Sequence, residues 1–250
     1  MAESIIQVNH LTVQFGERVV INDISFDVKK GEVFIVLGGS GCGKSTLLNH
    51  MVGLLEPASG EIFINGRDIV TSFGDDRNAI LDTIGVMFQS GALFGSMTLL
   101  ENVRLPLEEK TQLPLNIMNS IARHKLSLVG LVDFSDFMPA EISGGMQKRV
   151  AIARALAMDP EILFLDEPSA GLDPITSANL DKLILHLSQV LGVTFVVVSH
   201  ELPSIYAIAD RVIMLHDGKI IAMGKPQELR DHSESEFVKQ FFNREAVEAR

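Results

Sequence analysis

The sequence predicts an α/β protein with a parallel sheet core, an N-terminal antiparallel β-layer and an inserted helical subdomain. Residues 162–165 and 194–198 are continuous apolar runs, and such runs belong in a parallel sheet covered by helices on both faces. Residues 5–15 and 18–28 instead alternate apolar and polar side chains, as antiparallel strands do. Residues 91–158 change to helices and loops, which indicates the inserted subdomain.

The length and composition fit one domain. The chain has 250 residues, of which 46% are hydrophobic and 21% are charged, so it can bury a full core. We expect a single domain over residues 1–250. Within it we assign the core and β-layer to 1–90 and 159–230, the helical subdomain to 91–158 and a C-terminal tail to 231–250.

The elements of the first third follow from apolar runs and their stop signals. Residues 33–37 form an apolar strand, and 44–52 follow as a helix that Gly53 ends. Residues 61–66 and 84–88 are expected to be the next two strands.

In the helical subdomain, proline and serine mark the expected helix ends. Pro106 and Pro114 are expected to break the chain, and a helix follows from Leu115 to Val129. Another helix begins after Ser143, a suitable cap, and runs to Met158.

A long helix is expected between the two apolar strands. Asp173 suits its cap and Pro174 its first position. Its apolar residues keep helical spacing and are expected to be core: Leu180, Leu183, Ile184, Leu187 and Val190. Residues 211–216 and 219–222 then pair as a hairpin around Asp217-Gly218.

A glycine-rich loop joins the strand at 33–37 to the helix at 44–52. Its residues are Gly38, Gly39, Ser40, Gly41, Cys42, Gly43, Lys44, Ser45 and Thr46. Glycines let successive backbone N–H groups wrap one anion, and the helix places its positive dipole end behind it. Lys44 can reach the β- and γ-phosphates of a nucleoside triphosphate, and Ser45 can offer its hydroxyl to Mg²⁺. The motif is typical of a P-loop NTPase with a RecA-like sheet; a glycine turn without a ligand is the weaker alternative.

Four polar side chains follow the apolar strands at their carboxyl ends, where open parallel sheets bind ligands. They are Gln89, Asp166, Glu167 and His200. Asp166 suits a carboxylate that holds Mg²⁺, and Glu167 is placed to orient or deprotonate an attacking water. His200 can contact the γ-phosphate, and Gln89 can ligate the metal or the water. Each alone has a simpler interpretation as a helix cap or a solvated loop residue, but together they indicate catalysis.

Two further features concern the nucleotide and its partner. Phe15 ends a strand and either stacks on an adenine face or is a half-buried strand aromatic. Ser143, Gly144 and Gly145 open a second helix N-terminus, which a triphosphate already held by the first loop does not need. The simplest use is to close over a nucleotide held by another copy, so we expect a dimer.

These residues together resemble the nucleotide-binding subunit of an ABC transporter. Gly38–Ser45 match the family's Walker A motif and Gln89 its Q-loop, and residues 142–146 match its signature motif. Residues 162–166 match Walker B. The resemblance makes Glu167 the catalytic glutamate, residues 169–173 the D-loop, His200 the switch histidine and Phe15 the adenine-stacking aromatic. It implies an ATPase that uses ATP and Mg²⁺ and works as a homodimer with integral-membrane permease subunits, which it contacts through the helical subdomain.

A narrower resemblance comes from residues 89–94 with Thr98, residues 101–103 and residues 105–107. They look like the ATPase of Mla-type lipid transporters of Gram-negative envelopes. This implies phospholipid transport between inner and outer membrane, Mce-domain and small STAS-type accessory subunits, and a peripheral position on the cytoplasmic side of the inner membrane. An ABC ATPase for an amino acid, a metal or a peptide is the alternative, and a soluble non-transport ABC ATPase is a more distant one.

Net charge, cysteine content and the lack of targeting signals bear on the partners and the location of the protein. The net charge of −11 argues against nucleic acid as a partner, which needs clustered Lys and Arg. The single cysteine, Cys42, excludes an internal disulfide and is expected to fill space in its loop. No secretory signal and no apolar run long enough to span a membrane are expected.

Two features stay open. Met146 stands where most of the family has Gln, and we expect the next residue, Gln147, to supply the missing amide. The tail carries an apolar stripe at Phe237, Val238, Phe241 and Phe242, which packs either on its own domain or on the dimer mate.

Overall fold

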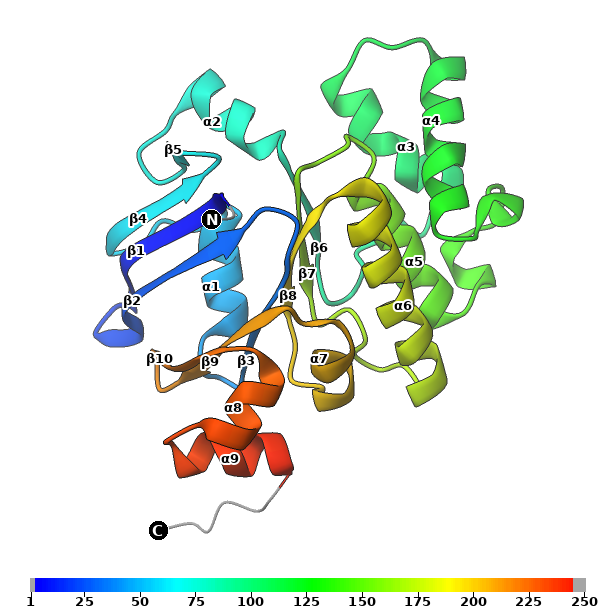
Figure 1. Cartoon of the computed structure of the whole chain (residues 1–250). Helices are drawn as coiled ribbons and strands as arrows, with labels where there is room; N and C mark the ends of the chain where they lie inside the picture. The colour runs from blue at the N-terminus through cyan, green and yellow to red at the C-terminus, as the bar shows by residue number, and fades with distance from the viewer. Residues whose placement is uncertain (1–2, 245–250) are drawn as a thin grey trace.

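The computed structural model describes residues 3–244, and its centre is a six-stranded sheet (Figure 1). The strands are β3 (Val33–Gly38), β6 (Ile84–Met87), β7 (Ile162–Asp166), β8 (Thr194–Val198), β9 (Arg211–His216) and β10 (Lys219–Gly224). Their order is β10-β9-β3-β8-β7-β6, with every pair parallel except β10 on β9. The predicted fold class is confirmed. The parallel strands end at one edge, where the polar residues that follow them meet.

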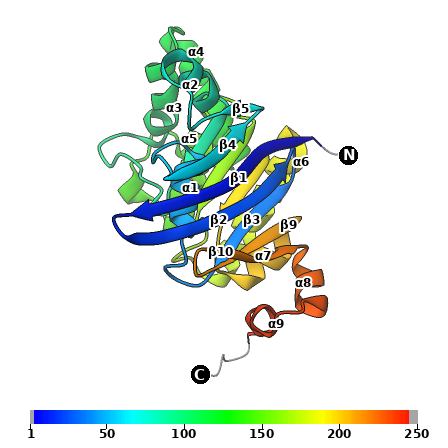
Figure 2. The same cartoon turned by 90° about the vertical axis from the view of Figure 1, so that its left-hand side faces the viewer.

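A second, antiparallel sheet forms the predicted N-terminal β-layer (Figure 2). It contains β1 (Ser4–Phe15), β2 (Arg18–Lys29), β4 (Ser59–Ile64) and β5 (Arg67–Asp68). Their order is β2-β1-β4-β5. Alternate residues of β1 and β2 are buried, so one face of this layer packs on the core and the other meets solvent.

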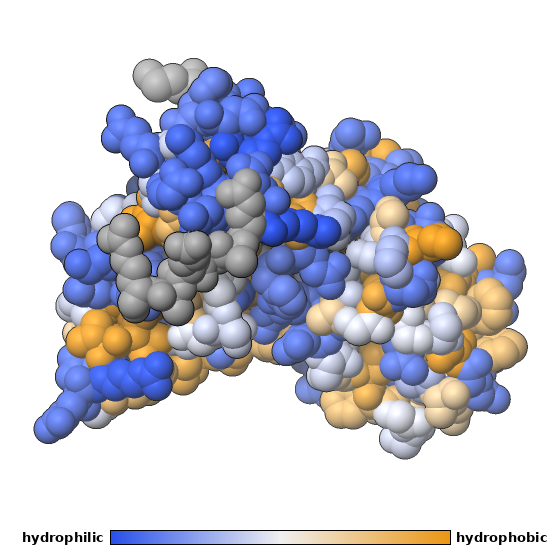
Figure 3. All heavy atoms as spheres, turned by 90° about the horizontal axis from the view of Figure 1, so that it is seen from below, coloured by the Kyte–Doolittle hydropathy of each residue, from blue (hydrophilic) through white to orange (hydrophobic). Residues whose placement is uncertain are grey.

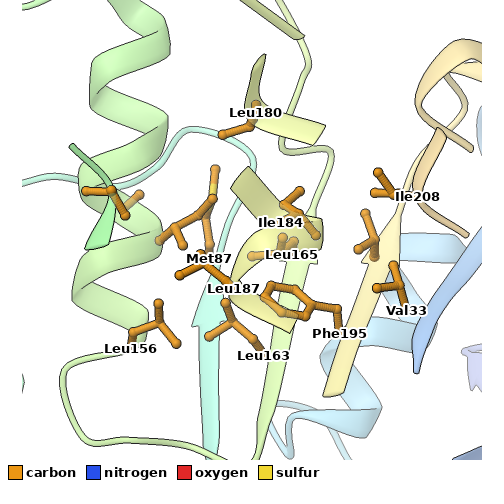
Figure 4. Close-up of a cluster of buried hydrophobic side chains, with 14 of the residues drawn as sticks. Val33, Met87, Leu156, Leu163, Leu165, Leu180, Ile184, Leu187, Phe195 and Ile208 are labelled. Atoms are coloured by element: carbon orange, nitrogen blue, oxygen red, sulfur yellow. The ribbon is translucent and has the colours of Figure 1, made fainter. Parts of the chain in front are cut away.

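The central sheet separates two hydrophobic cores because its strands are apolar on both faces. In β3, Ile35 and Leu37 point into one core, while Phe34 and Val36 point into the other. The second core lies between the sheet and the β-layer and includes α1 (Lys44–Met51). The first core is closed by α5 (Gly144–Ala155), α6 (Pro174–Leu191) and α7 (Leu202–Ile208). Figure 4 shows its centre, where Met87, Leu163 and Phe195 of the sheet meet Ile184 and Leu187 of α6.

Residues 91–158, the predicted helical subdomain, are mostly helical and lie to the right in Figure 1. Its elements are α3 (Leu99–Lys110), α4 (Leu115–Leu128), two short 3₁₀ helices (Val132–Phe134 and Pro139–Glu141) and α5. Pro114 separates α3 from α4 as predicted, and α5 ends at Ala155 instead of Met158. A further helix, α2 (Gly74–Leu81), precedes β6 and was not predicted. Within residues 3–244, none of the helices combines the length and the hydropathy needed to cross a membrane.

The predicted break at Pro106 is wrong, because Pro106 lies inside α3. Thr98 and Glu101 cap this helix reciprocally: Thr98 Oγ1 accepts from Glu101 N at 3.2 Å, and Glu101 Oε2 accepts from Thr98 N at 2.8 Å. The buried Asn102 amide donates to the carbonyls of three preceding residues. This well-fixed first turn, with the burial of Leu107, outweighs the one hydrogen bond that proline cannot donate.

The end of the chain forms α8 (Pro226–His232) and α9 (Glu236–Asn243). Val238 and Phe242 of α9 are buried in the first core, so the tail helix packs on its own domain. Residues 245–250 of the predicted tail lie outside the described residues. In α6, four of the five predicted core positions pack inward, but Val190 is 61% exposed because it lies in the last turn, beside the Gly192 C-cap.

Candidate functional site

The glycine-rich loop between β3 and α1 has a backbone that requires glycine. Gly38 has a φ of +152°, and a Cβ there would lie 2.3 Å from the Leu215 carbonyl oxygen. Gly43, the N-cap of α1, has a φ of 103°. Lys44 is buried, and its Nζ donates to the carbonyls of Gly38 at 3.0 Å and Gly39 at 2.9 Å. The lysine is therefore held against the loop that precedes it, with its ammonium group among backbone dipoles.

A cavity of about 820 Å³ opens over this loop, within the usual size range of small-molecule sites. It is lined by twelve of the predicted residues: Phe15, Gly38, Gly39, Ser40, Gly41, Gly43, Lys44, Ser45, Thr46, Gln89, Glu167 and His200. The fold thus gathers around one hollow the end of β1, the segment from β3 into α1, and the loops after β6, β7 and β8. Cys42 is different, since its side chain packs against the second core and faces a neighbouring hollow.

Asp166, the last residue of β7, lies beside the start of α1. Its Oδ1 accepts a hydrogen bond from Ser45 Oγ at 3.3 Å. Burial raises the pKa of Asp166, the Ser45 hydrogen bond lowers it, and the neighbouring Glu167 charge raises it further. The buried carboxylate and the hydroxyl are oxygen donors of the kind Mg²⁺ prefers, and the charges of Lys44 and Lys148 offset part of the carboxylate charge.

Removing this charge is expected to stabilise the nucleotide-free protein. Because the folded-state pKa is raised, stability is lost as pH rises from the ordinary carboxyl pKa through the raised value. Asp166→Asn removes this loss, so Tm at pH 7 is expected to rise by roughly 2–4 °C, the effect of about 1 kcal/mol in a chain of this size. Thermal unfolding measured from pH 7 towards pH 4 checks this, since the difference between variant and wild type must shrink with falling pH. A variant less stable than wild type at pH 7 contradicts it.

Glu167, directly after β7, has one paired and one unpaired carboxylate oxygen. Oε1 lies 2.8 Å from His200 Nδ1, while the buried Oε2 has no hydrogen-bond partner among the described residues. Glu167 also has a φ of 47°, rare for a residue other than glycine, and its N–H donates to Val198 O at 2.9 Å. The β8 backbone thus holds the strained residue in place, and His200 fixes its carboxylate. The buried Oε2 is thus an acceptor that no donor among the described residues satisfies, and a water bound beside Glu167 would satisfy it.

Gln89 follows β6, and two cations of α5 that were not predicted hold the loop around it. Lys148 Nζ donates to the Gln89 carbonyl. Arg154 donates to the carbonyls of Gly91 at 2.7 Å and Ala92 at 2.8 Å. Burial lowers the pKa of Lys148, and the two carboxylates after β7 oppose that shift. The only sequence signal for Lys148 is its position three residues after Gly145, on the same face of α5.

Ser143, Gly144 and Gly145 do not line the cavity. Ser143 Oγ accepts from Met146 N at 3.3 Å and caps α5 as predicted. The helix lies across the central sheet from α1, so its N-terminus and the glycine-rich loop do not meet in one chain (Figure 1). A Cβ at Gly145 would lie 2.4 Å from Thr176 Cγ2, whereas one at Gly144 has only Leu172 at 4.0 Å. Within one chain, the predicted second anion site is therefore separate from the glycine-rich loop.

A family model described as ABC transporter matches residues 21–170, which include the glycine-rich loop, the Ser143 helix and Asp166. This chain belongs to the ABC transporter family.

Relatives of known name narrow this assignment. The cassette is 40% identical to the "Intermembrane phospholipid transport system ATP-binding protein MlaF" of Haemophilus influenzae, over 92% of this chain and 87% of the relative. It is also 40% identical to the "Probable ribonucleotide transport ATP-binding protein mkl" of Mycobacterium tuberculosis, over 95% of this chain and 66% of that protein. The dimeric structure of the ATP-binding cassette MJ0796 bound to ADP and Pi has a TM-score of 0.79 at 33% identity, covering 88% of this chain and 98% of MJ0796. The chain is an MlaF-type ABC ATPase, the ATP-driven subunit of a transporter.

The structure shows one contact of the Gln147 amide, whose Nε2 donates to the Pro139 carbonyl at 2.9 Å within the same chain. That this amide replaces the glutamine missing at Met146 stays a prediction. Met146 packs against the first core. In this cassette the N-terminus of α5 therefore presents the Ser143 hydroxyl, the following glycines and the helix dipole.

Proposed function

We propose that two copies of this ATPase close over ATP and Mg²⁺ and thereby drive a membrane transporter whose cargo is phospholipid. One observation carries the proposal. The residues assigned to phosphate and water line one cavity with Ser45 and Gln89, and Asp166 is hydrogen-bonded to Ser45. Ser143–Gly145 lie across the sheet and need a second copy to reach a nucleotide. The dimeric state named for MJ0796 supports this arrangement.

Lys44 and the amides of residues 38–46 bind and neutralise the phosphates, with the dipole of α1 behind them. Ser45, Asp166 and Gln89 would supply the protein oxygens that hold Mg²⁺. When bound, the metal ion offsets charge on the phosphates.

Glu167 takes a hydrogen bond from the attacking water on its free Oε2 and accepts its proton. His200 orients that carboxylate and lies close enough to the cavity to contact the γ-phosphate. Phe15, half exposed at the far wall, stacks on the adenine. Ser143 and Gly144 of the second copy then complete the site by donating to the γ-phosphate.

The membrane partner is proposed to dock on the helical subdomain at 91–158. Exposed Phe94, Phe137 and Met138 lie there, and Figure 3 shows apolar areas scattered over the lobe on its right, the side of α3 to α5. These three exposed apolar side chains are the proposed contact residues. We propose permease subunits as this partner and Mce-domain and STAS-type proteins as accessory subunits. The complex would place the ATPase on the cytoplasmic side of the inner membrane.

Phospholipid as cargo follows from the name of the MlaF relative and from the loop at 89–107. The mkl relative, named for ribonucleotide transport at the same 40% identity, supports a second candidate, a transporter with a polar cargo. Purification of the full chain with its permease, followed by mass spectrometry of bound lipid and ATP-dependent lipid transfer between vesicles, separates the two. Lipid transfer that requires ATP supports the first; a complex that hydrolyses ATP but moves no lipid contradicts it.

A further inference from the structure

The cavity over the glycine-rich loop is lined by a second aromatic side chain, which comes from the other end of the chain. Phe15, Arg18 and Val20 of the β1–β2 hairpin line the cavity, and so does Phe241 of α9. Phe15 is 51% exposed, so about half of its side chain is accessible to a ligand. Figure 1 shows α9 at the lower end of the molecule, on the same side as the hairpin turn and the start of α1.

Residues before and after Phe241 in α9 make contacts that fix this helix on the domain. Val238 and the adjacent Phe242 are buried in the first core, and Tyr206 Oη donates to the Phe242 carbonyl at 3.2 Å. Phe237, one turn earlier, packs on His216 with ring centroids 4.4 Å apart. The Phe241 ring meets the Phe242 ring edge to face at 5.7 Å. A half-buried aromatic ring is thus held at the cavity wall by its own helix.

We propose that Phe241 is a specificity residue for the nucleotide, which forms a second aromatic wall for the base beside Phe15. A base placed between two rings buries more of its apolar surface than a base on one ring, and aromatic contacts add to that burial. The phosphates, held at the other end of the cavity, are unaffected. This inference rests on the proposed stacking of adenine on Phe15 and adds a contribution from the C-terminal helix.

The test compares ATP with inorganic tripolyphosphate, which carries the phosphates but neither base nor ribose. Calorimetric titration of the full chain gives Kd for both ligands. Phe241→Ala is expected to raise Kd for ATP by about 3- to 10-fold, while Kd for tripolyphosphate changes less than about twofold. Phe241→Leu keeps the apolar volume, and hence the fold, but it removes the aromatic ring. It is therefore also expected to raise Kd for ATP. Phe241→Tyr restores the aromatic face and is expected to bind ATP as wild type does.

The matched control is Phe237→Ala, which loosens the same helix at a residue that lines the neighbouring hollow instead of the nucleotide cavity. It is expected to leave both Kd values unchanged. The inference is overturned if Phe241→Ala and Phe241→Leu bind ATP as wild type does. It is also overturned if Phe241→Ala raises Kd for tripolyphosphate as much as Kd for ATP, or if Phe237→Ala raises Kd for ATP as much as Phe241→Ala does. In each of these cases a wild-type chain that hydrolyses ATP leaves the proposed function standing, whereas a wild-type chain without ATPase activity contradicts that function itself.

Discussion

Glu167→Gln is expected to bind ATP as tightly as wild type and to hydrolyse it about 10²- to 10⁴-fold more slowly, the usual contribution of a general base. The substitution keeps the shape and the hydrogen bond to His200, but an amide cannot take the proton of the attacking water. Glu167 Oε2 has no hydrogen-bond partner among residues 3–244. The substitution therefore removes the base without breaking a hydrogen bond that stabilises the fold. ATP-loaded Glu167→Gln should therefore accumulate as a closed dimer.

Single-turnover phosphate release and light scattering with ATP check both halves of this prediction. The matched control is Glu161→Gln, at the opposite end of β7, where the carboxylate pairs with exposed Lys30 at 2.9 Å. That variant should turn over ATP at the wild-type rate. Wild-type turnover by Glu167→Gln would remove Glu167 from the role of base, and a monomeric ATP-bound form would contradict closure of the dimer over ATP.

Lys44→Ala is expected to fail one step earlier, at nucleotide binding. The buried Lys44 ammonium donates to the carbonyls of Gly38 and Gly39. Its positive charge would neutralise part of the charge of a bound phosphate. Its loss leaves the phosphates with amide dipoles alone, so turnover should fall by about 10²- to 10³-fold and ATP should bind more weakly. Equilibrium binding of ATP distinguishes this variant from Glu167→Gln, which binds.

Lys30→Ala is the control for this variant, because Lys30 is an exposed lysine whose ion pair contributes little. It should bind and hydrolyse ATP normally. If Lys44→Ala retained wild-type affinity, the cradle at residues 38–46 would not be the phosphate site.

Much of the site could be predicted because its residues are tied to topology. Residues 38–46 are consecutive, and their glycines have one conformational use. Asp166 and His200 are far apart in sequence, yet Asp166 directly follows one apolar run and His200 lies two residues after another. Parallel strands bring such positions to one edge. Ser143, followed by two glycines, could be predicted as the N-cap of α5.

What sequence patterns missed depends on tertiary packing. Pro106 obeys a local rule that a capping box and buried neighbours outweigh. Phe241 belongs to an amphipathic stripe that predicts a packed helix, but which cavity the ring reaches depends on how α9 docks through Val238 and Phe242. Lys148 looks like a surface cation until α5 is placed against the loop at Gln89.

The central claim, that each ATP site is completed by the Ser143 helix of a second copy, is tested by mixing two inactive variants. Lys44→Ala disables the phosphate loop. Gly144→Asp places a carboxylate where the γ-phosphate would bind, at a position whose Cβ meets no own-chain atom closer than Leu172 at 4.0 Å. Each variant alone should be inactive, since every site in its homodimer carries the defect.

A mixed dimer has one site with both defects and one site with neither. After subunit exchange, the mixture should therefore recover about a quarter of wild-type ATPase activity, because half of the random dimers are mixed and each has one intact site. If mixed dimers form, as native mass spectrometry would show, and activity stays at the level of the separate variants, the Ser143 helix does not act on the partner's nucleotide and the account is contradicted.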